Sequence, residues 1–355
     1  MNTVDNPEIK KLLEAAISKN ASDLHLNVGV APTLRIDGRL VAIENEPVLT
    51  TELANKLVKS LMSEEQWQRF QVKKELDFSF SFDGTRFRTN AFYQKSELTA
   101  SLRLIPGIIK SINELGLPPV LEKFTTHSQG FVIISGPTGH GKSTTLAALI
   151  EDINKNRNEH IITIEDPIEY VFEHKKSIIS QREVGADTNS FSGALKSALR
   201  EDPNVILVGE MRDLESIEAA LTLAETGHLV FTTLHTNSAA QTADRIIDVF
   251  PDHQQQQVRL QMANVLLGVV SQRLLPRTSG GRIAACEIMI ADNAVRNTIR
   301  EGGTHQLTNI IQTSASEGMI SLDKVLAELV SKGEVTIDDA LTWALDPKAL
   351  KMMVY

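Results

Sequence analysis

The sequence predicts an α/β protein in which a doubly wound parallel sheet follows a smaller N-terminal domain of mixed α and β character. Short apolar runs alternate with helical segments in the middle of the chain, which is typical of such a sheet. The first run leads into a glycine-rich loop and then a helix, whereas the N-terminal third carries two hairpin signals. The 355 residues are enough for about two domains.

Composition narrows the class of protein. Hydrophobic residues make up 42% of the chain and charged residues 23%, as in ordinary globular proteins. The formal net charge of −9 argues against a broad basic face, so no nucleic-acid partner is expected. The single cysteine, Cys286, stands in an apolar strand-like run and is expected in the core, in a reducing cytoplasm. We find no signal peptide, and no apolar run approaches the ~20 residues of a membrane span, so no direct membrane insertion is expected.

The N-terminal domain begins with a helix. Asn6 can cap it, Pro7 takes the favoured first position, and apolar residues then repeat on one face. The two-residue hairpin turns are expected at Asp37-Gly38 and Asp83-Gly84. The remaining elements expected here are strands at residues 22–26, 33–36, 39–41, 78–82, 86–92 and 99–104, and helices at residues 52–62 and 64–71.

Two arginines stand on polar faces of predicted neighbouring strands. Residues 86–92 place Arg88 on a polar face, and residues 99–104 place Arg103 opposite two leucines. From the pattern alone, both are solvated strand residues. The domain is expected to cover residues 1–104, and a short linker restricted by prolines is expected at residues 105–119.

The second domain, residues 120–355, is expected to hold the parallel sheet and, over residues 290–355, a helical C-terminal subregion. A capping box is expected at Thr336 and Asp339. The expected strands are residues 131–135, 160–164, 205–208, 229–233 and 282–288, and the expected helices are residues 144–150, 214–225, one after Pro251, and 322–330.

The loop at residues 136–143 fits the phosphate-binding pattern G-x-x-x-x-G-K-[ST] at every fixed position. A buried strand before it and a helix after it are the context in which loop amides and a helix N-terminus hold phosphate. Both flanks disfavour the alternative, a glycine-rich turn without ligand. Lys142 is expected to reach the β- and γ-phosphates, and the Ser143 hydroxyl is expected to hold Mg²⁺. The expected nucleotide-binding residues are Gly136, Thr138, Gly139, His140, Gly141, Lys142, Ser143 and Thr144.

Ionisable residues follow the other predicted parallel strands at their carboxyl ends, which share one ligand-binding edge in a doubly wound sheet. These residues are Glu165, Asp166 and Glu169 after the second strand, Glu210 after the third and His235 after the fourth. Glu210 has the place of a Walker B acidic residue, and we expect it either to hold the Mg²⁺ shell through water or to polarise the attacking water. Asp166 is a second possible metal ligand, and Glu165 and Glu169 are further catalytic candidates.

Two histidines, His228 and His235, flank the last parallel strand. His235 is expected at the ligand edge, where it could contact the γ-phosphate and sense hydrolysis. Both are catalytic candidates, and for either one a hydrogen-bonded structural role is the alternative.

Taken together, these segments resemble the retraction ATPases of type IV pili, within the secretion ATPase superfamily. The resemblance covers the whole chain and is carried by residues 136–148 (Walker A), 162–170 (Asp box), 181–185, 198–213 (Walker B) and 224–236 (His box). It implies a PAS-like N-terminal domain, a RecA-like ATPase domain and a homohexameric ring that uses ATP and Mg²⁺. It also implies that Arg88 and Arg103 reach bound nucleotide as the two domains close, and so act in catalysis.

The family further implies a cytoplasmic motor for pilus retraction and twitching motility, which meets the inner membrane through a pilus platform protein and has a paralogous retraction ATPase as another partner. Residues 294–301 resemble a retraction signature except at Val295 and Thr298, and His140 replaces the usual serine of the loop, as Asn204 replaces an aspartate. The alternatives are an accessory retraction ATPase, a traffic ATPase for secretion or DNA uptake, and a nucleotide-binding scaffold ring with negligible turnover. A kinase is disfavoured because no second-substrate pocket is visible in the sequence.

Overall fold

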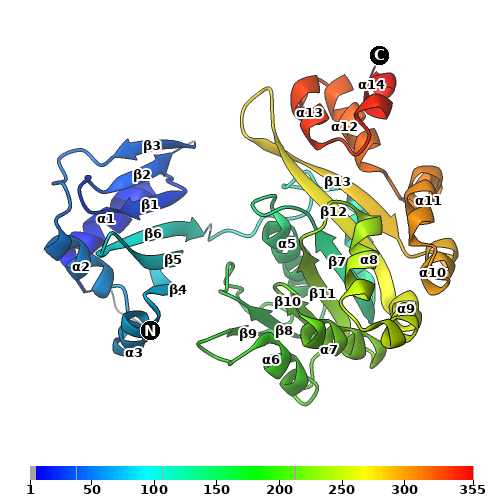
Figure 1. The fold of residues 1–355 in the computed structure, drawn as a ribbon, viewed down its shortest axis with the longest axis horizontal. Helices are drawn as coiled ribbons and strands as arrows, with labels where there is room; N and C mark the ends of the chain where they lie inside the picture. The colour runs from blue at the N-terminus through cyan, green and yellow to red at the C-terminus, as the bar shows by residue number, and fades with distance from the viewer. Residues whose placement is uncertain (1–4, 37, 106, 212, 355) are drawn as a thin grey trace. The chain divides into compact units, whose positions relative to one another are not determined.

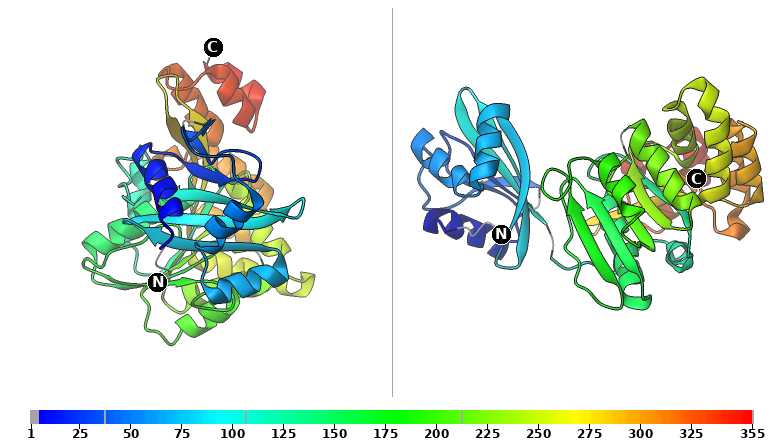
Figure 2. Two further views of the ribbon diagram at one scale, coloured as in Figure 1. Left: turned by 90° about the vertical axis from the view of Figure 1, so that its left-hand side faces the viewer. Right: turned by 90° about the horizontal axis from the view of Figure 1, so that it is seen from below.

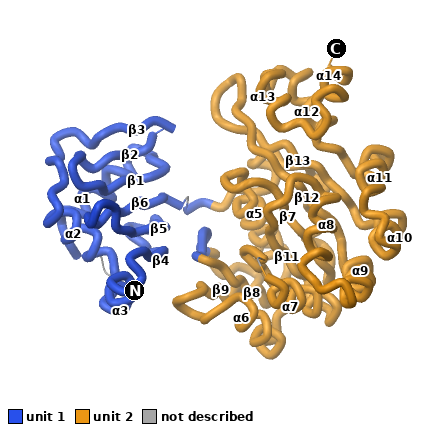
Figure 3. Tube along the Cα trace, viewed as in Figure 1, with its two compact units in different colours: residues 1–108, 167–171 blue, residues 109–166, 172–355 orange. Residues whose placement is uncertain are grey.

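The computed structural model describes residues 5–36, 38–105, 107–211 and 213–354, which form two compact units (Figure 3). Unit 1 consists of Met1–Ile108 together with Pro167–Val171, and unit 2 consists of Ile109–Asp166 with Phe172–Tyr355. Residues 1–4 of the expected N-terminus, Asp37 of the first expected turn, Pro106 of the expected linker and Arg212 of the Walker B segment lie outside the described residues. Within those described ranges, no helix is both long and apolar enough to cross a membrane.

Unit 1 is an antiparallel sheet with helices on one face (Figure 1). The strands run in the order β3 (Arg39–Ala42), β2 (Thr33–Ile36), β1 (Asp23–Leu26), β6 (Glu97–Ile105), β5 (Thr85–Gln94) and β4 (Glu75–Phe82). The helices are α1 (Pro7–Ser18), α2 (Thr51–Lys59) and α3 (Glu64–Lys73). The side chain of Asn6 accepts hydrogen bonds from the amides of Glu8 and Ile9, so the predicted N-cap is confirmed.

The two faces of this sheet differ in chemistry. Apolar residues of all three helices, among them Leu13, Leu57 and Phe70, pack in one core with Phe78 and other inward-facing strand residues. The opposite face is polar. Asp83 and Gly84 form the turn of the β4–β5 hairpin, and their φ angles are +47° and +72°. These positive angles are those of the predicted two-residue turn.

Unit 2 is built on a seven-stranded sheet, mostly parallel, in the order β13-β12-β7-β11-β10-β8-β9. Its strands are β7 (Gly130–Ser135), β8 (His160–Glu165), β9 (Ile178–Glu183), β10 (Val205–Val208), β11 (Leu229–Leu234), β12 (Leu266–Pro276) and β13 (Arg282–Ile290). Only β13 runs antiparallel to its neighbour. Every residue of β7, β10 and β11 is buried, as expected for strands covered on both faces.

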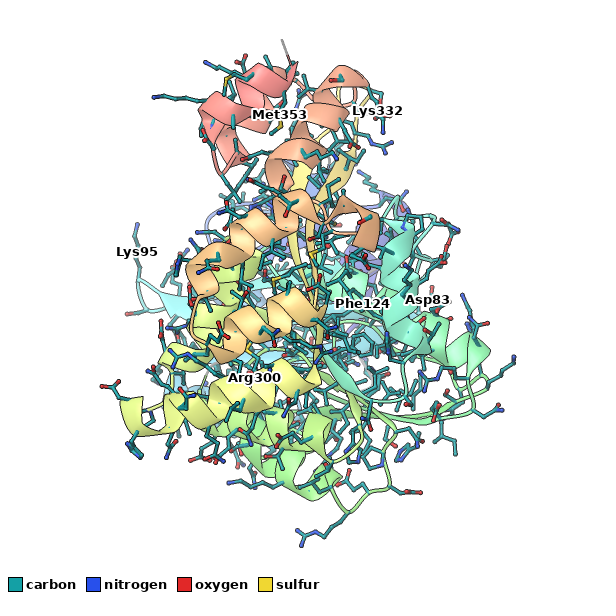
Figure 4. All side chains as sticks on the ribbon, turned by 90° about the vertical axis from the view of Figure 1, so that its right-hand side faces the viewer. Asp83, Lys95, Phe124, Arg300, Lys332 and Met353 are labelled. Atoms are coloured by element: carbon teal, nitrogen blue, oxygen red, sulfur yellow. The ribbon has the colours of Figure 1, made fainter. Side chains whose placement is uncertain are left out.

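Helices cover both faces of this sheet (Figure 2). The helices α6 (Phe191–Ala198), α7 (Leu214–Glu225), α8 (Ala239–Asp248) and α9 (Asp252–Val265) share one large core with the strand residues Phe131 and Ile133. The helices α4 (Glu122–Thr126) and α5 (Lys142–Asn156) pack together on the other face. There Phe124, labelled in Figure 4, lies so close to Gly268 of β12 that a Cβ at Gly268 would come within 2.6 Å of its ring.

The C-terminal part is helical, as predicted. It contains α10 (Asn293–Arg300), α11 (Leu307–Thr313), α12 (Leu322–Ser331), α13 (Ile337–Trp343) and α14 (Pro347–Val354). Short 3-10 turns lie at Pro119–Leu121, Thr304–Gln306 and Ala315–Glu317. The last three helices, residues 322–354, have a core of their own that includes Leu275 of β12 and Ala285 of β13, and we call them the C-terminal helical segment. Lys332 and Met353, labelled in Figure 4, mark its outer end.

Most elements agree with the sequence analysis, and the differences have local causes. Helix α13 has the predicted cap, since the Asp339 amide donates to the Thr336 hydroxyl over 3.1 Å. Cys286 is 1% exposed, as expected for a core residue, and burial raises the pKa of its thiol to about 12. Strands β9 and β12 and helices α4, α6 and α8 were not predicted, and within the predicted helical subregion α10, α11 and α14 were not predicted individually.

Candidate functional site

The glycine-rich loop joins β7 to α5 at the carboxyl edge of the sheet, as the motif requires. Gly141 precedes α5 with a φ of +81°, and a Cβ at Gly136 would lie 2.4 Å from the Gln272 carbonyl oxygen, so a side chain at Gly136 cannot be accommodated. Lys142 is 7% exposed and donates hydrogen bonds to the carbonyl oxygens of Gly136 (2.8 Å) and Pro137 (3.0 Å). Its ammonium group therefore lies inside the curve of the loop.

His235 connects the phosphate loop, which follows β7, to Glu210, which follows β10. It follows β11, and its Nδ1 lies 3.4 Å from the Lys142 ammonium and 3.5 Å from the Thr138 hydroxyl. Its Nε2 lies 3.2 Å from a carboxylate oxygen of Glu210, which follows β10. Because an ammonium can only donate, these partners favour the neutral tautomer in which Nδ1 accepts and Nε2–H donates to Glu210. The structure thus brings together three residues predicted separately, Lys142, His235 and Glu210.

Glu165 ends β8 at the same edge of the sheet. It is 8% exposed and accepts hydrogen bonds from the Thr163 hydroxyl (2.7 Å) and the Gln181 amide (3.3 Å). Gly209, at the end of β10, allows this close approach of the two strands, because a Cβ there would lie 3.4 Å from the Glu165 Cα. Asp166, the next residue, is exposed. Glu165 is therefore a buried, oriented carboxylate, whereas Asp166 faces solvent.

Glu169 belongs to unit 1, together with both predicted arginines. Arg88 and Arg103 lie on the neighbouring strands β5 and β6, as the strand pattern predicted, and are direct cross-strand partners there. Arg88 contacts Glu169 (3.3 Å between Nη1 and Oε1), and Arg103 contacts Asp23 (3.0 Å between Nε and Oδ1). Each arginine therefore has a carboxylate partner within unit 1, and their predicted roles at the nucleotide stay predictions.

His228 lies at the opposite end of β11 from His235. Its carbonyl oxygen accepts the Gly130 amide at the start of β7, and its Nδ1 lies 2.8 Å from the Leu223 carbonyl oxygen. The phosphate loop begins at the other end of β7, after Ser135. The structure does not bring His228 to the site of this chain, because strand β11 separates the two histidines. The contacts of His228 are those of the structural alternative.

Gln272 of β12 was missed by the sequence analysis. It is 2% exposed, its Nε2 donates to the His140 carbonyl oxygen (2.8 Å), and its Oε1 accepts from the Thr145 hydroxyl of α5 (2.7 Å). It therefore holds the phosphate loop and the first turn of α5 to the sheet. The polar run at residues 271–273 between two apolar stretches was the signal that could have identified it.

The residues present fit a magnesium ion bound together with nucleotide. Within the described ranges, no group of three or more histidine, cysteine or acidic residues is arranged to hold a metal by itself. Mg²⁺ in phosphate-loop proteins needs few protein ligands, because phosphate oxygens and water complete its octahedral shell. Ser143 lies in the first turn of α5, and Glu210 contacts His235, which in turn contacts the phosphate loop. These two residues match that requirement.

A protein-family model described as "Type II/IV secretion system protein" matches residues 4–341. The chain belongs to this family. It is 48% identical, over 96% of its length and 99% of the relative's, to the type IV pilus retraction ATPase PilT of Pseudomonas aeruginosa. It is 41% identical, over 98% of its length and 91% of the relative's, to the type IV pilus ATPase PilU of the same organism.

Among solved structures, a crystal structure of the pilus retraction motor PilT with bound ADP matches with a TM-score of 0.90 and 48% identity, over 97% of this chain and 99% of the other. The fold class predicted from the sequence, an N-terminal α+β domain and a parallel-sheet ATPase domain with a helical C-terminal part, is confirmed by this match and by the two units described above.

Proposed function

We propose that this chain is a motor ATPase that hydrolyses ATP to drive retraction of type IV pili. The observation that carries the proposal is the contact series from Lys142 through His235 to Glu210, residues that follow the carboxyl ends of the strands β7, β11 and β10. Full-length similarity to a retraction ATPase, higher than that to PilU, supports retraction as the task. An accessory retraction ATPase is the second candidate, favoured by Val295 and Thr298, which depart from the retraction signature.

In this proposal the loop residues have separate tasks. The loop amides and Lys142 bind the phosphates, and Ser143 with Glu210, the latter through water, holds Mg²⁺, which neutralises charge on the β- and γ-phosphates. Glu210 orients and polarises the attacking water, with Glu165 and Asp166 as further carboxylates at the same edge. His235 lies between Lys142 and Glu210, so a change at the γ-phosphate reaches Glu210 through one imidazole ring.

Arg88 and Arg103 supply positive charge in the proposed transition state when the N-terminal domain, residues 1–104, closes on an ATPase domain, residues 120–355. Arg88 then exchanges its contact with Glu169 for one with phosphate. Closure thereby couples hydrolysis to movement, while residues 105–119 act as the linker. Glu169 keeps Arg88 in place before closure.

The proposed assembly is a homohexameric ring in the cytoplasm. It works on an inner-membrane pilus platform protein and is peripherally associated with the inner membrane through the pilus machinery. A paralogous retraction ATPase shares the task. The proposed motor uses ATP hydrolysis to move the N-terminal domain. ATP turnover is therefore the first property to test.

Steady-state ATP hydrolysis by the purified full chain tests the enzymatic part of the proposal. We expect Mg²⁺-dependent turnover that Lys142→Ala abolishes, because that ammonium is the loop's contact with the β- and γ-phosphates. Lys155→Ala is the matched control, since Lys155 lies near the other end of the same helix, has a side chain about half exposed, and pairs with Glu151 over 3.3 Å. Turnover that is absent from the unmodified chain, or that survives Lys142→Ala, contradicts the proposal and favours a scaffold ring.

A further inference from the structure

The His140 side chain, at the variable position before Gly141, points away from the inside of the phosphate loop and onto β12. Its Nδ1 accepts a hydrogen bond from the Leu274 amide over 2.9 Å, and its carbonyl oxygen accepts the Gln272 side chain. The strand β7, which pairs with β12, ends at Ser135, opposite Ser271, so Leu274 lies beyond the paired part of β12 on that side. The imidazole of His140 provides an acceptor for this amide where the β7 strand no longer can.

Trp343, at the end of α13, packs on the same imidazole. The two ring centroids are 4.6 Å apart with the planes at 73°, an edge-to-face arrangement. The Arg273 guanidinium lies over the same Trp343 ring, 5.6 Å from its centre, and donates a hydrogen bond to the Asn237 carbonyl oxygen over 2.7 Å. Asn237 is two residues after His235, so Trp343 touches one residue of the phosphate loop and a second that supports the loop after β11.

We propose that His140 is a positioning residue which ties the phosphate loop to β12, and that Trp343 holds its ring there, so that the C-terminal helical segment and the nucleotide site control each other. This segment is also held to the sheet by an apolar cluster at Leu275 and Ala285 and by the Leu322 amide, which donates to the Glu287 carboxylate of β13. Its Glu334 pairs with Arg277, just after β12, and none of these contacts involves a residue of the phosphate loop. A nucleotide that fixes the loop stabilises the Trp343 contact, and loss of that contact loosens the loop by the same factor.

The proposal assigns different contributions to the two contacts of His140. His140→Asn keeps an acceptor at the position of Nδ1 and loses the ring, whereas His140→Phe keeps a ring for Trp343 and loses the acceptor. We expect each variant, and also Trp343→Ala, to raise the dissociation constant of ADP and the KM for ATP about 2- to 10-fold, the size expected for one modest interaction. The kcat is expected to change little, because none of these side chains meets the γ-phosphate.

A double-mutant cycle separates this coupling from a general loss of packing. If Trp343 acts through His140, Trp343→Ala raises the ADP dissociation constant in the chain with His140 but adds little in the His140→Ser chain. If Trp343 only stabilises the helical segment, Trp343→Ala lowers the thermal midpoint of unfolding and changes ADP binding equally in both backgrounds. That second result overturns the proposal.

Tryptophan fluorescence gives an independent test that needs no catalysis. The chain has two tryptophans, so Trp67→Phe leaves Trp343 as the only one. We titrate ADP with Mg²⁺ into this variant, measuring binding by calorimetry and the emission of Trp343 in parallel. The expected result is an emission change that follows ADP binding and is lost in Trp67→Phe/His140→Ser.

The inference rests on the proposed nucleotide site, and the two can fail separately. ADP binding without any emission change overturns the role of Trp343 while the proposed function stands. Failure of ADP to bind in the calorimeter overturns the proposed function and, with it, this inference.

Discussion

Three side chains at the centre of the site, Lys142, His235 and Glu210, form a continuous chain of contacts, of which Glu210 is the member able to accept a proton from water. Its carboxylate is about one quarter exposed and lies 3.2 Å from His235 Nε2. Such a group is both oriented and open to a water molecule, as general-base or water-positioning catalysis requires.

Replacement of Glu210 by glutamine is the first residue-scale prediction. Glu210→Gln keeps the size and the contact with His235 but cannot take up a proton, so we expect kcat to fall about 100-fold or more with ADP affinity retained. Steady-state turnover and calorimetry measure the two quantities. Glu215→Gln, an exposed glutamate on α7, is the control and should retain full turnover. Equal turnover in both variants would exclude Glu210 as the group that acts on water.

The second residue-scale prediction concerns pH. Burial, followed by the nearby charges of Arg273, Lys142 and Arg282, lowers the pKa of His140 below its usual value of 6.5. A lowered folded-state pKa means that the unfolded chain binds the proton first, so the stability contributed by neutral His140 is complete above pH 6.5 and is lost as pH falls through the lowered pKa.

Protonation of Nδ1 also breaks the hydrogen bond from the Leu274 amide. We therefore expect unfolding free energies from urea titration to fall between pH 7.5 and 5, and to fall less in His140→Asn. The pKa values of His25 and His127 are also lowered, mainly by burial, so part of the slope should persist in that variant. An identical pH dependence of the two chains would contradict the assignment to His140.

At the scale of elements, β12 supports the site although it carries none of the residues predicted to act on nucleotide. Gln272 joins the phosphate loop to α5, and the backbone of the same residue faces Gly136. The strand is therefore a wall of the nucleotide site as well as part of the core.

Removal of this support is the element-scale prediction. In Gln272→Leu the Thr145 hydroxyl and the His140 carbonyl lose buried partners, so we expect a loss of about 1–3 kcal/mol in unfolding free energy and a higher KM for ATP. Urea titration and steady-state kinetics measure these effects. The matched control is Gln254→Leu on the exposed face of α9, where stability should change by less than about 0.5 kcal/mol. A KM unchanged in Gln272→Leu would show that the strand has no effect on the loop.

Elements with strong local signals were predicted well, and those without them were missed. Helix α1 has a capping residue and a proline at its start, and α7 begins and ends at the predicted residues. Strand β12 was missed because no turn separates it from α9: Val265 ends the helix and Leu266 begins the strand, both apolar. Strand β9 was missed because its Ile178–Glu183 sequence, at the edge of the sheet, is half polar and does not alternate.

The site was predicted where strand order alone fixes it. Parallel strands end at one edge, which places Lys142, Glu210 and His235 together without knowledge of any contact. The same rule places His228, which precedes β11, at the edge opposite His235, so strand direction alone argues against His228 at this site. The hydrogen bonds of Gln272 to His140 and Thr145, and the contact between His140 and Trp343, could not be predicted, because they join residues far apart in the chain.

For the whole molecule, the proposal requires that unit 1 contributes to hydrolysis through Arg88 and Arg103. We expect Arg88→Ala and Arg103→Ala to lower kcat about 100-fold or more, since charge aimed at a phosphoryl transition state has effects of this size, with ADP affinity nearly unchanged. Arg39→Ala, an exposed arginine on β3 of the same sheet, is the control. Full turnover in both variants would limit the catalytic machinery to unit 2.

The most direct measurement of the central claim is deletion of the gene in its own organism, followed by complementation with the unmodified chain or with Glu210→Gln. Surface pili are counted by electron microscopy, and twitching is scored on agar. A retraction motor predicts cells that carry excess pili and do not twitch, a defect that the unmodified chain repairs and Glu210→Gln does not. Cells without pili, or cells repaired equally by Glu210→Gln, would contradict the claim.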